Sequence, residues 1–348
     1  MSTKWTIVLI CYSRRQERSS EKANGGTVST RSPDPFAGPL EMVTASRIAR
    51  LFYLDGWTKV QIADELGLTR FKVARLLELA RSSGMVRISV VGAGSLDLVL
   101  SERLYHQFGL SHAVVVNTTT GDDQEIRNQI GAAAADLLSE ITTPEDVLGI
   151  GWARVVLAMA AKLRGLRAKR IVQLTGALTR ADVEATSVDI VRSIARDAKA
   201  EASVFYAPMI VSDEQTARGL YRQDAVAKAV TQFDTVTKAV VGVGGWNPPS
   251  STLYDALTRS EQTLMRKAGV QADLSGVLLD ARGDAIDTVL TRRIIAISAP
   301  QLRNIPEVIG IAYGLDKVAA AQAGIRGGYL NALVTHSEFA RQLLNIAG

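Results

Sequence analysis

One segment constrains the fold of this chain more than any other: residues 58–77, TKVQIADELGLTRFKVARLL. The hydroxyls of Thr58 and Thr69 can each cap the start of a helix by accepting a bond from an unpaired backbone N–H. Gly67, between them, suits the left-handed backbone with which helices commonly end. Two short helices joined by a tight turn are therefore predicted. This is the pattern of a helix-turn-helix, whose second helix enters the major groove of DNA.

Apolar residues recur at helical spacing on both predicted helices, which gives each a buried face. They are Ile62, Ala63 and Leu66 on the first helix, and Val73, Leu76, Leu77 and Ala80 on the second. A preceding helix is expected to complete the core with Met42, Ile48, Ala49, Phe52 and Tyr53, with Trp57 as a cover. Residues 85–90 alternate apolar and polar side chains, which predicts a short strand or wing. An ordinary helical hairpin has the same periodicity, but the order of cap, glycine, cap and basic helix favours DNA binding.

The second helix carries the side chains that would reach the DNA. The candidate DNA-binding residues are Thr58, Thr69, Arg70, Phe71, Lys72 and Arg75. Arg70 is the candidate for a base contact, because arginine pairs bidentately with guanine. Lys72 and Arg75 are expected at phosphates. Phe71 either meets a thymine methyl group or packs against the preceding helix.

The distribution of charge supports this interpretation. The chain has 40 basic and 35 acidic side chains, a net charge of +5. Residues 1–90 hold 14 basic and 8 acidic side chains, a net +6, and residues 91–348 hold 26 and 27, a net −1. The positive excess therefore lies in the part that contains the candidate DNA-binding helix, where attraction to phosphates requires it.

Beyond residue 96 the chain alternates between apolar runs and helical segments, which is typical of an α/β domain with a mostly parallel sheet covered on both faces. Expected strands are residues 113–116, 147–150, 170–174, 203–206, 239–243, 293–297 and 308–312, and expected helices are residues 96–108, 127–141, 153–164 and 316–325. We expect a disordered tail over residues 1–40, a helix-turn-helix domain over 41–91, a linker over 92–96 and an effector and oligomerisation domain over 97–348. The tail is either inert or adds nonspecific phosphate contacts.

Three glycine-containing turns follow expected strands, at residues 149–154, 242–246 and 314–317. Parallel sheets bind ligands at the carboxyl ends of their strands. Glycine lets a backbone approach an anion, and a helix start offers unpaired N–H groups to it. Arg154 and Lys317 would add positive charge. Each glycine turn can also be a plain steric requirement, so the prediction of a ligand site depends on the three together.

Other site classes find little support. Cys11 is the single cysteine, the histidines are His106, His112 and His336, and no cluster has metal-ligand spacing, so neither a metal nor a cofactor is expected. No apolar run approaches the ~20 residues of a membrane helix. Residues 5–11 are apolar but too short for a signal peptide with this flank. A cytoplasmic protein is expected.

The ordered motifs resemble the SorC family of sugar-binding transcriptional regulators, which is related to the DeoR-type and central glycolytic gene regulators. The blocks that carry the resemblance span about residues 44–346 and are LTRFKVARLLELARSSGMVRI, VLGIGW, VQLTG, YAP, GVGGW, GVQAD, LDARG and IPEVIGIAYGLDKVAAAQAGIRGGYLNALVTH. The resemblance implies a C-terminal domain similar to phosphosugar isomerases, a sugar or phosphosugar effector, double-stranded operator DNA, and a homodimeric or homotetrameric repressor or other regulator.

The resemblance also implies an effector site. The implied effector-binding residues are Gly149, Gly151, Trp152, Ala153, Arg154, Gly176, Gly244, Asp273 and Lys317, with residues 151–154 and Lys317 at the phosphate and Gly176, Gly244 and Asp273 at the sugar. This chain departs from the family pattern at three positions, so the identity of the effector cannot be inferred from the family. Val155 stands where a threonine is common, Leu315 interrupts a pair of small residues, and His336 stands where an aspartate is common.

A catalytic phosphosugar isomerase and an effector-independent DNA-binding protein are the alternatives. Isomerisation needs a positioned acid and base. Asp273 and Asp280 are candidate carboxylates, but no histidine accompanies them in a glycine-flanked turn, and Asp280 is expected at a strand end or hairpin turn. We therefore expect no enzyme.

Overall fold

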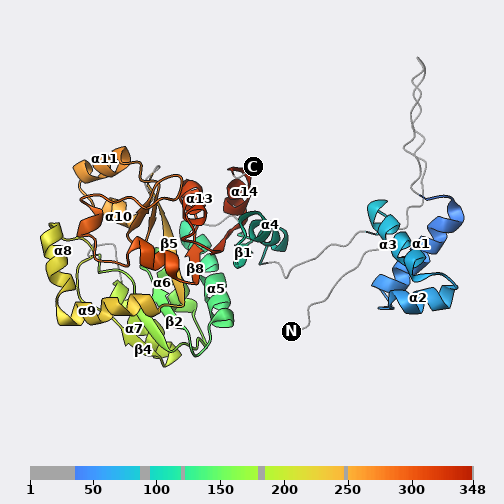
Figure 1. The fold of residues 1–348 in the computed structure, drawn as a ribbon, viewed down its shortest axis with the longest axis horizontal. Coiled ribbons are helices and arrows are strands. Elements are labelled where there is room, and N and C mark those ends of the chain that lie inside the picture. Colours follow the sequence, from blue (N-terminus) through green and yellow to red (C-terminus); the bar gives the residue numbers. More distant parts are fainter. Residues whose placement is uncertain (1–35, 87–94, 119–121, 179–184, 247–249, 347–348) are drawn as a thin grey trace, which may run out of the picture. The chain divides into compact units, whose positions relative to one another are not determined.

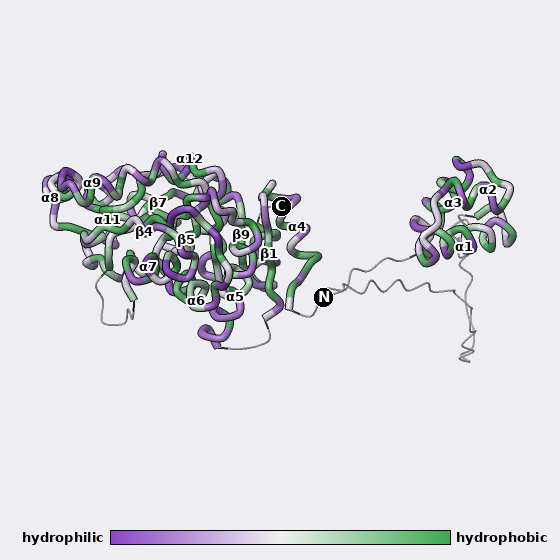
Figure 2. Tube along the Cα trace, turned by 90° about the horizontal axis from the view of Figure 1, so that it is seen from below, coloured by the Kyte–Doolittle hydropathy of each residue, from purple (hydrophilic) through white to green (hydrophobic). Residues whose placement is uncertain are grey.

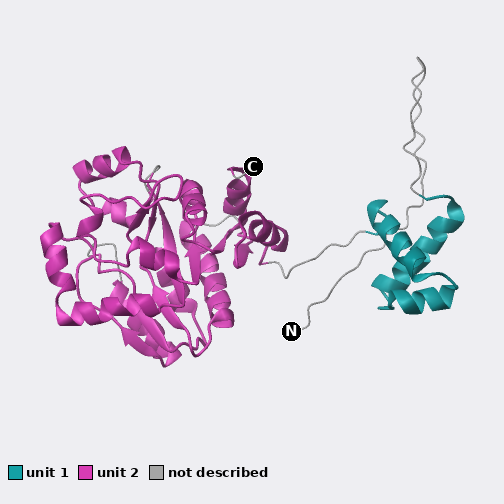
Figure 3. Ribbon diagram, in the orientation of Figure 1, with its two compact units in different colours: residues 1–91 teal, residues 92–348 magenta. Residues whose placement is uncertain are grey.

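The computed structural model describes residues 36–86, 95–118, 122–178, 185–246 and 250–346. The chain divides into two compact units, residues 1–91 and 92–348, coloured separately in Figure 3. Most of the wing expected over residues 85–90 and most of the expected linker lie outside the described residues.

Three helices form the first unit: α1 (Pro39–Tyr53), α2 (Lys59–Leu66) and α3 (Arg70–Ser82). The expected caps are present. The Thr58 hydroxyl accepts from the Gln61 backbone N–H while the Gln61 side chain accepts from the Thr58 N–H, a capping box that satisfies two unpaired donors. Gly67 ends α2 with a φ of 64°, and the Thr69 hydroxyl accepts from the backbone N–H of Lys72. The helix-turn-helix prediction is confirmed.

The apolar faces of these helices share one core. Its buried members are Phe36, Ala45, Ile48, Ala49, Ile62, Ala63, Val73, Leu76, Leu77, Ala80 and Val86, and Trp57 is half-buried against them. In Figure 2 each of the three helices carries both hydrophobic and hydrophilic residues, as a core-facing helix should. Phe36 belongs to this core and α1 begins at Pro39, so this unit starts a few residues before the expected boundary at residue 41.

The second unit is an α/β domain around a parallel sheet, shown in Figure 1. The strand order is β1 (His112–Val116), β9 (Ala332–His336), β8 (Glu307–Ile311), β5 (Lys238–Gly245), β2 (Val147–Ile150), β3 (Arg170–Gln173) and β4 (Glu201–Ser203). All six pairings between these neighbours are parallel. A hairpin of β6 (Ala272–Leu274) and β7 (Val277–Leu279) pairs antiparallel with the end of β5. The predicted fold class is confirmed.

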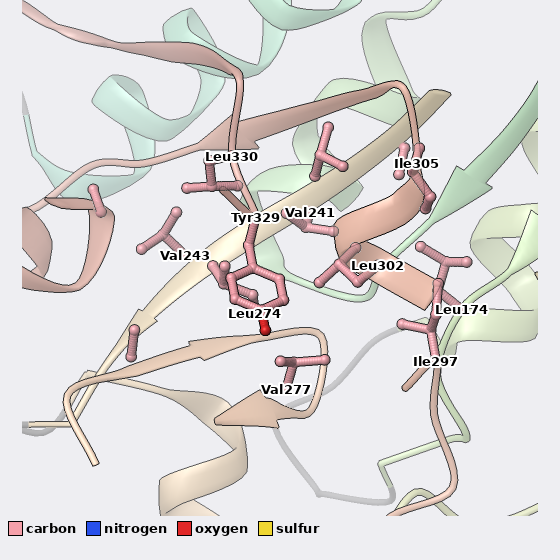
Figure 4. Packing of buried hydrophobic residues seen from close by; sticks show 14 of the residues in the cluster. Leu174, Val241, Val243, Leu274, Val277, Ile297, Leu302, Ile305, Tyr329 and Leu330 are labelled. Atoms are coloured by element: carbon pink, nitrogen blue, oxygen red, sulfur yellow. The ribbon is translucent and has the colours of Figure 1, made fainter. Parts of the chain in front are cut away.

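Helices cover both faces of the sheet. Side chains alternate between the two faces along each strand, so the apolar strands bury residues on both. On β5, Val240 packs with one core cluster while Val241 and Val243 pack with another. Helices α5 (Asp123–Ile141), α6 (Arg154–Lys162) and α7 (Ser187–Ala198) supply the first cluster. The second cluster receives residues from α4 (Leu98–Phe108), α8 (Glu214–Tyr221), α9 (Asp224–Val230), α12 (Ala299–Asn304), α13 (Val318–Arg326) and α14 (Ser337–Ile346). Figure 4 shows part of it, with Tyr329, Leu330, Leu274 and Val277 gathered around β5.

A third, smaller cluster lies under the β6–β7 hairpin. It contains Trp246, Met265 and Leu278 and receives residues from α10 (Thr252–Asp255) and α11 (Arg259–Lys267). The remaining helical turns are η1 (Thr231–Thr235), η2 (Thr291–Arg293) and η3 (Leu315–Lys317).

Two strand predictions are wrong. Residues 293–297 were expected as a strand but join their neighbours only through isolated bridges, Ile210 to Ile294 and Thr175 to Ala296. This segment is apolar because it is buried between other elements, which an apolar run alone cannot distinguish from a central strand. The strand expected over residues 203–206 ends at Ser203, where β4 lies at the edge of the sheet. Strand β9 and the β6–β7 hairpin were not predicted.

Candidate functional site

The order of the strands places a crevice at the middle of the sheet. From β2 the chain proceeds outward through β3 and β4, and from β5 it proceeds in the opposite direction through β8 and β9. β2 and β5 are neighbours, so the connections that follow them diverge to opposite sides. Parallel sheets bind ligands outside the carboxyl ends of two such strands.

A pocket of about 260 Å³ occupies this position. It is lined by the end of β5, by residues that follow β2, β3, β5 and β8, by the β6–β7 hairpin and by the first turn of α5. The lining residues used below are Asp123, Trp152, Ala153, Arg154, Val155, Thr175, Gly244, Ser250, Ser251, Asp255, Asp273, Ser275, Tyr313, Asp316 and Lys317. The three glycine-containing turns singled out in the sequence therefore meet at one cavity.

One part of the pocket is cationic. The Lys317 Nζ lies 4.5 Å from the centroid of the Tyr313 ring, and Arg154 begins α6 at the same cavity. Burial lowers the pKa of the Lys317 ammonium; Asp316 opposes this shift, and Arg154 reinforces it. A lysine held at a partly desolvated site beside another cation gains from any anion that enters.

Another part of the pocket offers hydroxyl groups. The Oγ1 of Thr175 and the Oγ atoms of Ser250 and Ser275 are buried and have no hydrogen-bond partner among the residues that the structure describes. Buried hydroxyls without partners are rare, because each loses its bonds to water. All three belong to residues that line the same cavity.

Asp273 anchors this hydroxyl-rich part. Its Oδ2 accepts a 2.6 Å hydrogen bond from the Ser251 hydroxyl, and its Oδ1 accepts a 2.9 Å bond from the Gly276 N–H. Burial raises the pKa of its carboxyl, and these two bonds act in the opposite direction. The carboxylate holds the serine and the hairpin tip in place beside the cavity.

Six of the nine implied effector residues line the pocket: Trp152, Ala153, Arg154, Gly244, Asp273 and Lys317. Gly149, Gly151 and Gly176 do not. A Cβ at Gly149 would lie 2.9 Å from the Leu174 side chain, one at Gly151 would lie 2.1 Å from Ser275 Oγ, and one at Gly176 would lie 2.8 Å from the Met209 backbone. Neighbouring protein atoms therefore occupy the space beside each of these glycines, and at Gly176 these atoms are backbone.

Sequence reasoning missed several lining residues. Thr175 lies inside the quoted VQLTG block, and Ser275 precedes a glycine in a dipeptide typical of turns, so both carried a weak signal. Tyr313 likewise lies inside a quoted block, and Asp123 and Ser250 carried no signal. Val155, where a threonine is common in the family, does line the pocket, so the missing hydroxyl is a change at the site itself.

The candidate DNA-binding surface lies on α3. Arg70, Phe71 and Lys72 are exposed on its first turn, and Phe71 is 87% exposed. Of the two interpretations of Phe71, packing against the preceding helix does not fit this exposure. The remaining candidates are engaged within the unit: Thr58 and Thr69 in the caps, and Arg75 in a 2.5 Å ion pair with Glu41.

The described part of the chain holds no group of three or more His, Cys, Asp or Glu side chains arranged to bind a metal. None of its helices is both long and apolar enough to span a membrane.

The chain and its second unit are similar to known proteins. Residues 94–345 match the family model described as "Putative sugar-binding domain". The chain is 28% identical over 311 residues to the transcriptional regulator LsrR of Escherichia coli, with 88% of this chain and 96% of that one covered. It resembles the full-length sorbitol operon regulator SorC from Klebsiella pneumoniae, with a TM-score of 0.68, 25% identity, and 88% of this chain and 100% of that one covered. A DeoR family transcriptional regulator from Listeria monocytogenes matches with a TM-score of 0.64 and 25% identity over 71% of this chain and 98% of that one.

Proposed function

The chain belongs to the SorC family of sugar-binding transcriptional regulators, and we propose that its pocket binds a sugar phosphate whose binding changes the affinity of α3 for operator DNA. The observation that carries this proposal is the composition of the pocket. Lys317 and Arg154 provide positive charge, while Thr175, Ser250 and Ser275 provide buried hydroxyls without partners in the described chain. A sugar phosphate or sugar acid has the matching groups, one anion and several hydroxyls.

The number of cations favours a single anionic group. Four carboxylates also line the pocket, those of Asp123, Asp255, Asp273 and Asp316. Their oxygens can accept hydrogen bonds from the hydroxyl groups of a sugar, and their negative charge would repel a second phosphate group. A monophosphate with its sugar hydroxyls in the hydroxyl-rich part of the pocket fits this balance better than a bisphosphate.

We propose a binding role for the pocket, without catalysis. Aldose–ketose isomerisation needs a carboxylate or histidine free to take a proton from carbon. Both oxygens of Asp273 already accept hydrogen bonds, from Ser251 and Gly276. His336 is buried at the end of β9 and does not line the pocket, and Asp280 bonds the N–H groups of its own turn, Arg282 and Asp284.

At the DNA, we propose that Arg70 and Phe71 face the bases and that Lys72 meets a phosphate. Arg75 would first have to leave its ion pair with Glu41, so its contact would be the weakest. One helix-turn-helix covers a short half-site, and a symmetric operator needs two. We therefore propose that the second unit associates with further copies of itself.

A titration on DNA tests this function. Full-length protein is mixed with duplex DNA from upstream of its own coding sequence, and hexose phosphates, pentose phosphates and their unphosphorylated sugars are titrated into the gel-shift reaction. At least one sugar phosphate should change the DNA affinity, and its parent sugar should act less strongly. Absence of DNA binding at low ionic strength, with every compound, contradicts the proposal, and turnover of a phosphosugar would favour the enzyme instead.

A further inference from the structure

Arg127 on α5 is a third cation beside the pocket. Its guanidinium lies 5.8 Å from the centroid of the Tyr313 ring, the same ring that Lys317 approaches to 4.5 Å. The Arg127 Nε is buried and meets no hydrogen-bond acceptor among the described residues. Two cations against one aromatic ring repel each other, although the ring attracts each of them. An anion between them would relieve the repulsion.

Helix α5 joins this cation to the sheet core. Asp123, in its first turn, lines the pocket, and Arg127 follows one turn later. Gly131 then packs so closely on α6 that a Cβ there would lie 2.9 Å from the backbone carbonyl carbon of Ala158. Since α6 itself begins with Arg154 at the pocket, both helices are anchored to the same site at their first turns.

The later turns of α5 lie beside the start of the second unit. Ser95 and Leu96 share a groove of about 620 Å³ with Ala133 and Leu137 of α5. Leu96 packs against the core cluster that contains Leu137.

This start of the unit is also tied to the edge strand β1. The Asp97 N–H donates to the Val115 carbonyl at 2.8 Å, and the Asn117 N–H donates to the Ser95 carbonyl at 2.9 Å. The first described residues after the connection from the DNA-binding unit are thus held by β1 and lie beside α5. A helix of 19 residues spans roughly 28 Å, so α5 reaches from the pocket to this start of the unit.

We propose that Arg127 completes the anion-binding part of the pocket and that α5 transmits anion binding to the anchor at residues 95–97. This deepens the proposed function and depends on it. A ligand shifts an equilibrium only by binding its two states unequally. Here Arg127 makes the contact that differs between the two states. When Arg127 binds the anion, the first turns of α5 are held against the pocket, and residues 95–97 are held more firmly on β1.

The first measurement concerns binding, with inorganic phosphate as the ligand at constant ionic strength. Full-length protein should be stabilised by phosphate in a thermal shift. Arg127→Gln should weaken that binding by about tenfold or more, because a hydrogen bond to a charged group is lost. Arg127→Lys keeps the charge and should retain part of the affinity. Arg222→Gln, at an exposed arginine of the same unit, is the matched control and should change nothing.

The second measurement concerns transmission. Hydrogen exchange of the Asp97 and Asn117 amides should slow when phosphate saturates the wild-type protein, and should not respond in Arg127→Gln at phosphate concentrations raised to saturate it. Leu96→Ala, which loosens the anchor, should keep the phosphate affinity and lose the exchange response.

The outcomes separate the two proposals. If Arg127→Gln binds phosphate like the wild-type protein, or if saturating phosphate leaves the two amides unchanged in the wild type, this inference is wrong while the proposed function can stand. If phosphate does not stabilise the wild-type protein and no sugar phosphate alters DNA binding, the proposed function itself fails.

Discussion

The two units of this chain place their candidate functional residues in opposite ways. In the first unit, Arg70, Phe71 and Lys72 lie outside the core, on the exposed side of a helix whose other side is buried. In the second, Lys317, Asp273 and Ser275 lie inside, where chain segments far apart in sequence converge. Residues of the first kind can change without altering the fold. Residues of the second kind are also part of the packing, so binding and stability change together.

The strongest test of this contrast is to unfold one unit alone. Leu76 is fully buried in the core of the first unit. Leu76→Asp should cost about 4 kcal/mol or more, because it buries a charge without a partner. We expect DNA binding to be lost, as measured by gel shift, while phosphate still stabilises the second unit. Phe71→Asp adds the same charge on the same helix at an exposed position, so its helix content by circular dichroism should stay native. Loss of the second unit's thermal transition in Leu76→Asp would show that the units do not fold independently.

A second test removes a cation from the pocket. Lys317→Gln should weaken binding of a sugar phosphate by about 2 kcal/mol, or about thirtyfold, because it removes a hydrogen bond to a charged group. The affinity for DNA without effector should be unchanged. Calorimetric titration gives the first quantity and gel shift the second. Lys228→Gln, at an exposed lysine paired with Asp224, is the control. Equal sugar phosphate affinities for Lys317→Gln and wild type would remove Lys317 from the site.

A third test sharpens the contrast within α3. Arg70→Ala should cost about 1–3 kcal/mol for the preferred operator and less for other sequences, because a base contact discriminates. Lys72→Ala should weaken binding to all sequences alike and reduce the slope of log affinity against log salt by about 0.9. Competition binding at several salt concentrations measures both. If the two variants behave identically, the separation into base and phosphate contacts is wrong.

The smallest expected effect is one of pH. Burial lowers the pKa of Lys317 from its ordinary value of 10.5, and a bound anion favours the charged form. Sugar phosphate affinity should therefore fall as pH rises through the lowered pKa, since binding must then take up a proton. Without ligand, the Lys317 amine binds its proton more tightly in the unfolded chain than in the folded protein. The contribution of Lys317 to the free energy of unfolding therefore rises with pH between the lowered pKa and 10.5. Titrations between about pH 7 and pH 10, where a phosphate ester is already a dianion, should show the fall in wild type and a flat profile in Lys317→Gln.

The first unit could be predicted almost completely from its sequence because its signals are local. Thr58, Gly67 and Thr69 determine where the helices start and stop through contacts within four residues. The surface of α3 then follows from periodicity alone. The ion pair between Arg75 and Glu41 was not foreseen, because it joins residues 34 positions apart.

The pocket could be predicted only in part because its residues are assembled by the sheet. The turns after β2 and β8 were identified, since glycine followed by a helix start marks such a turn. Residues 242–245, expected in a turn, instead belong to β5. Sequence could not show whether a glycine accommodates a ligand or neighbouring protein atoms. Gly149, which lies against the Leu174 side chain, and Gly176, which lies against the Met209 backbone, are of the second kind. Thr175 and Ser250 became visible as site residues only when their hydroxyls were found buried without a partner in the described chain.

The position of the cavity between β2 and β5 also has a consequence for biosynthesis. The DNA-binding unit leaves the ribosome early, whereas the cavity lacks one wall until Lys317 has been made. At ordinary translation speeds of roughly 5–20 residues per second, the remaining stretch takes roughly ten seconds or more. During that interval a nascent chain has its α3 surface but nothing with which to recognise a metabolite. Every newly made molecule therefore passes through a stage in which it is insensitive to its effector.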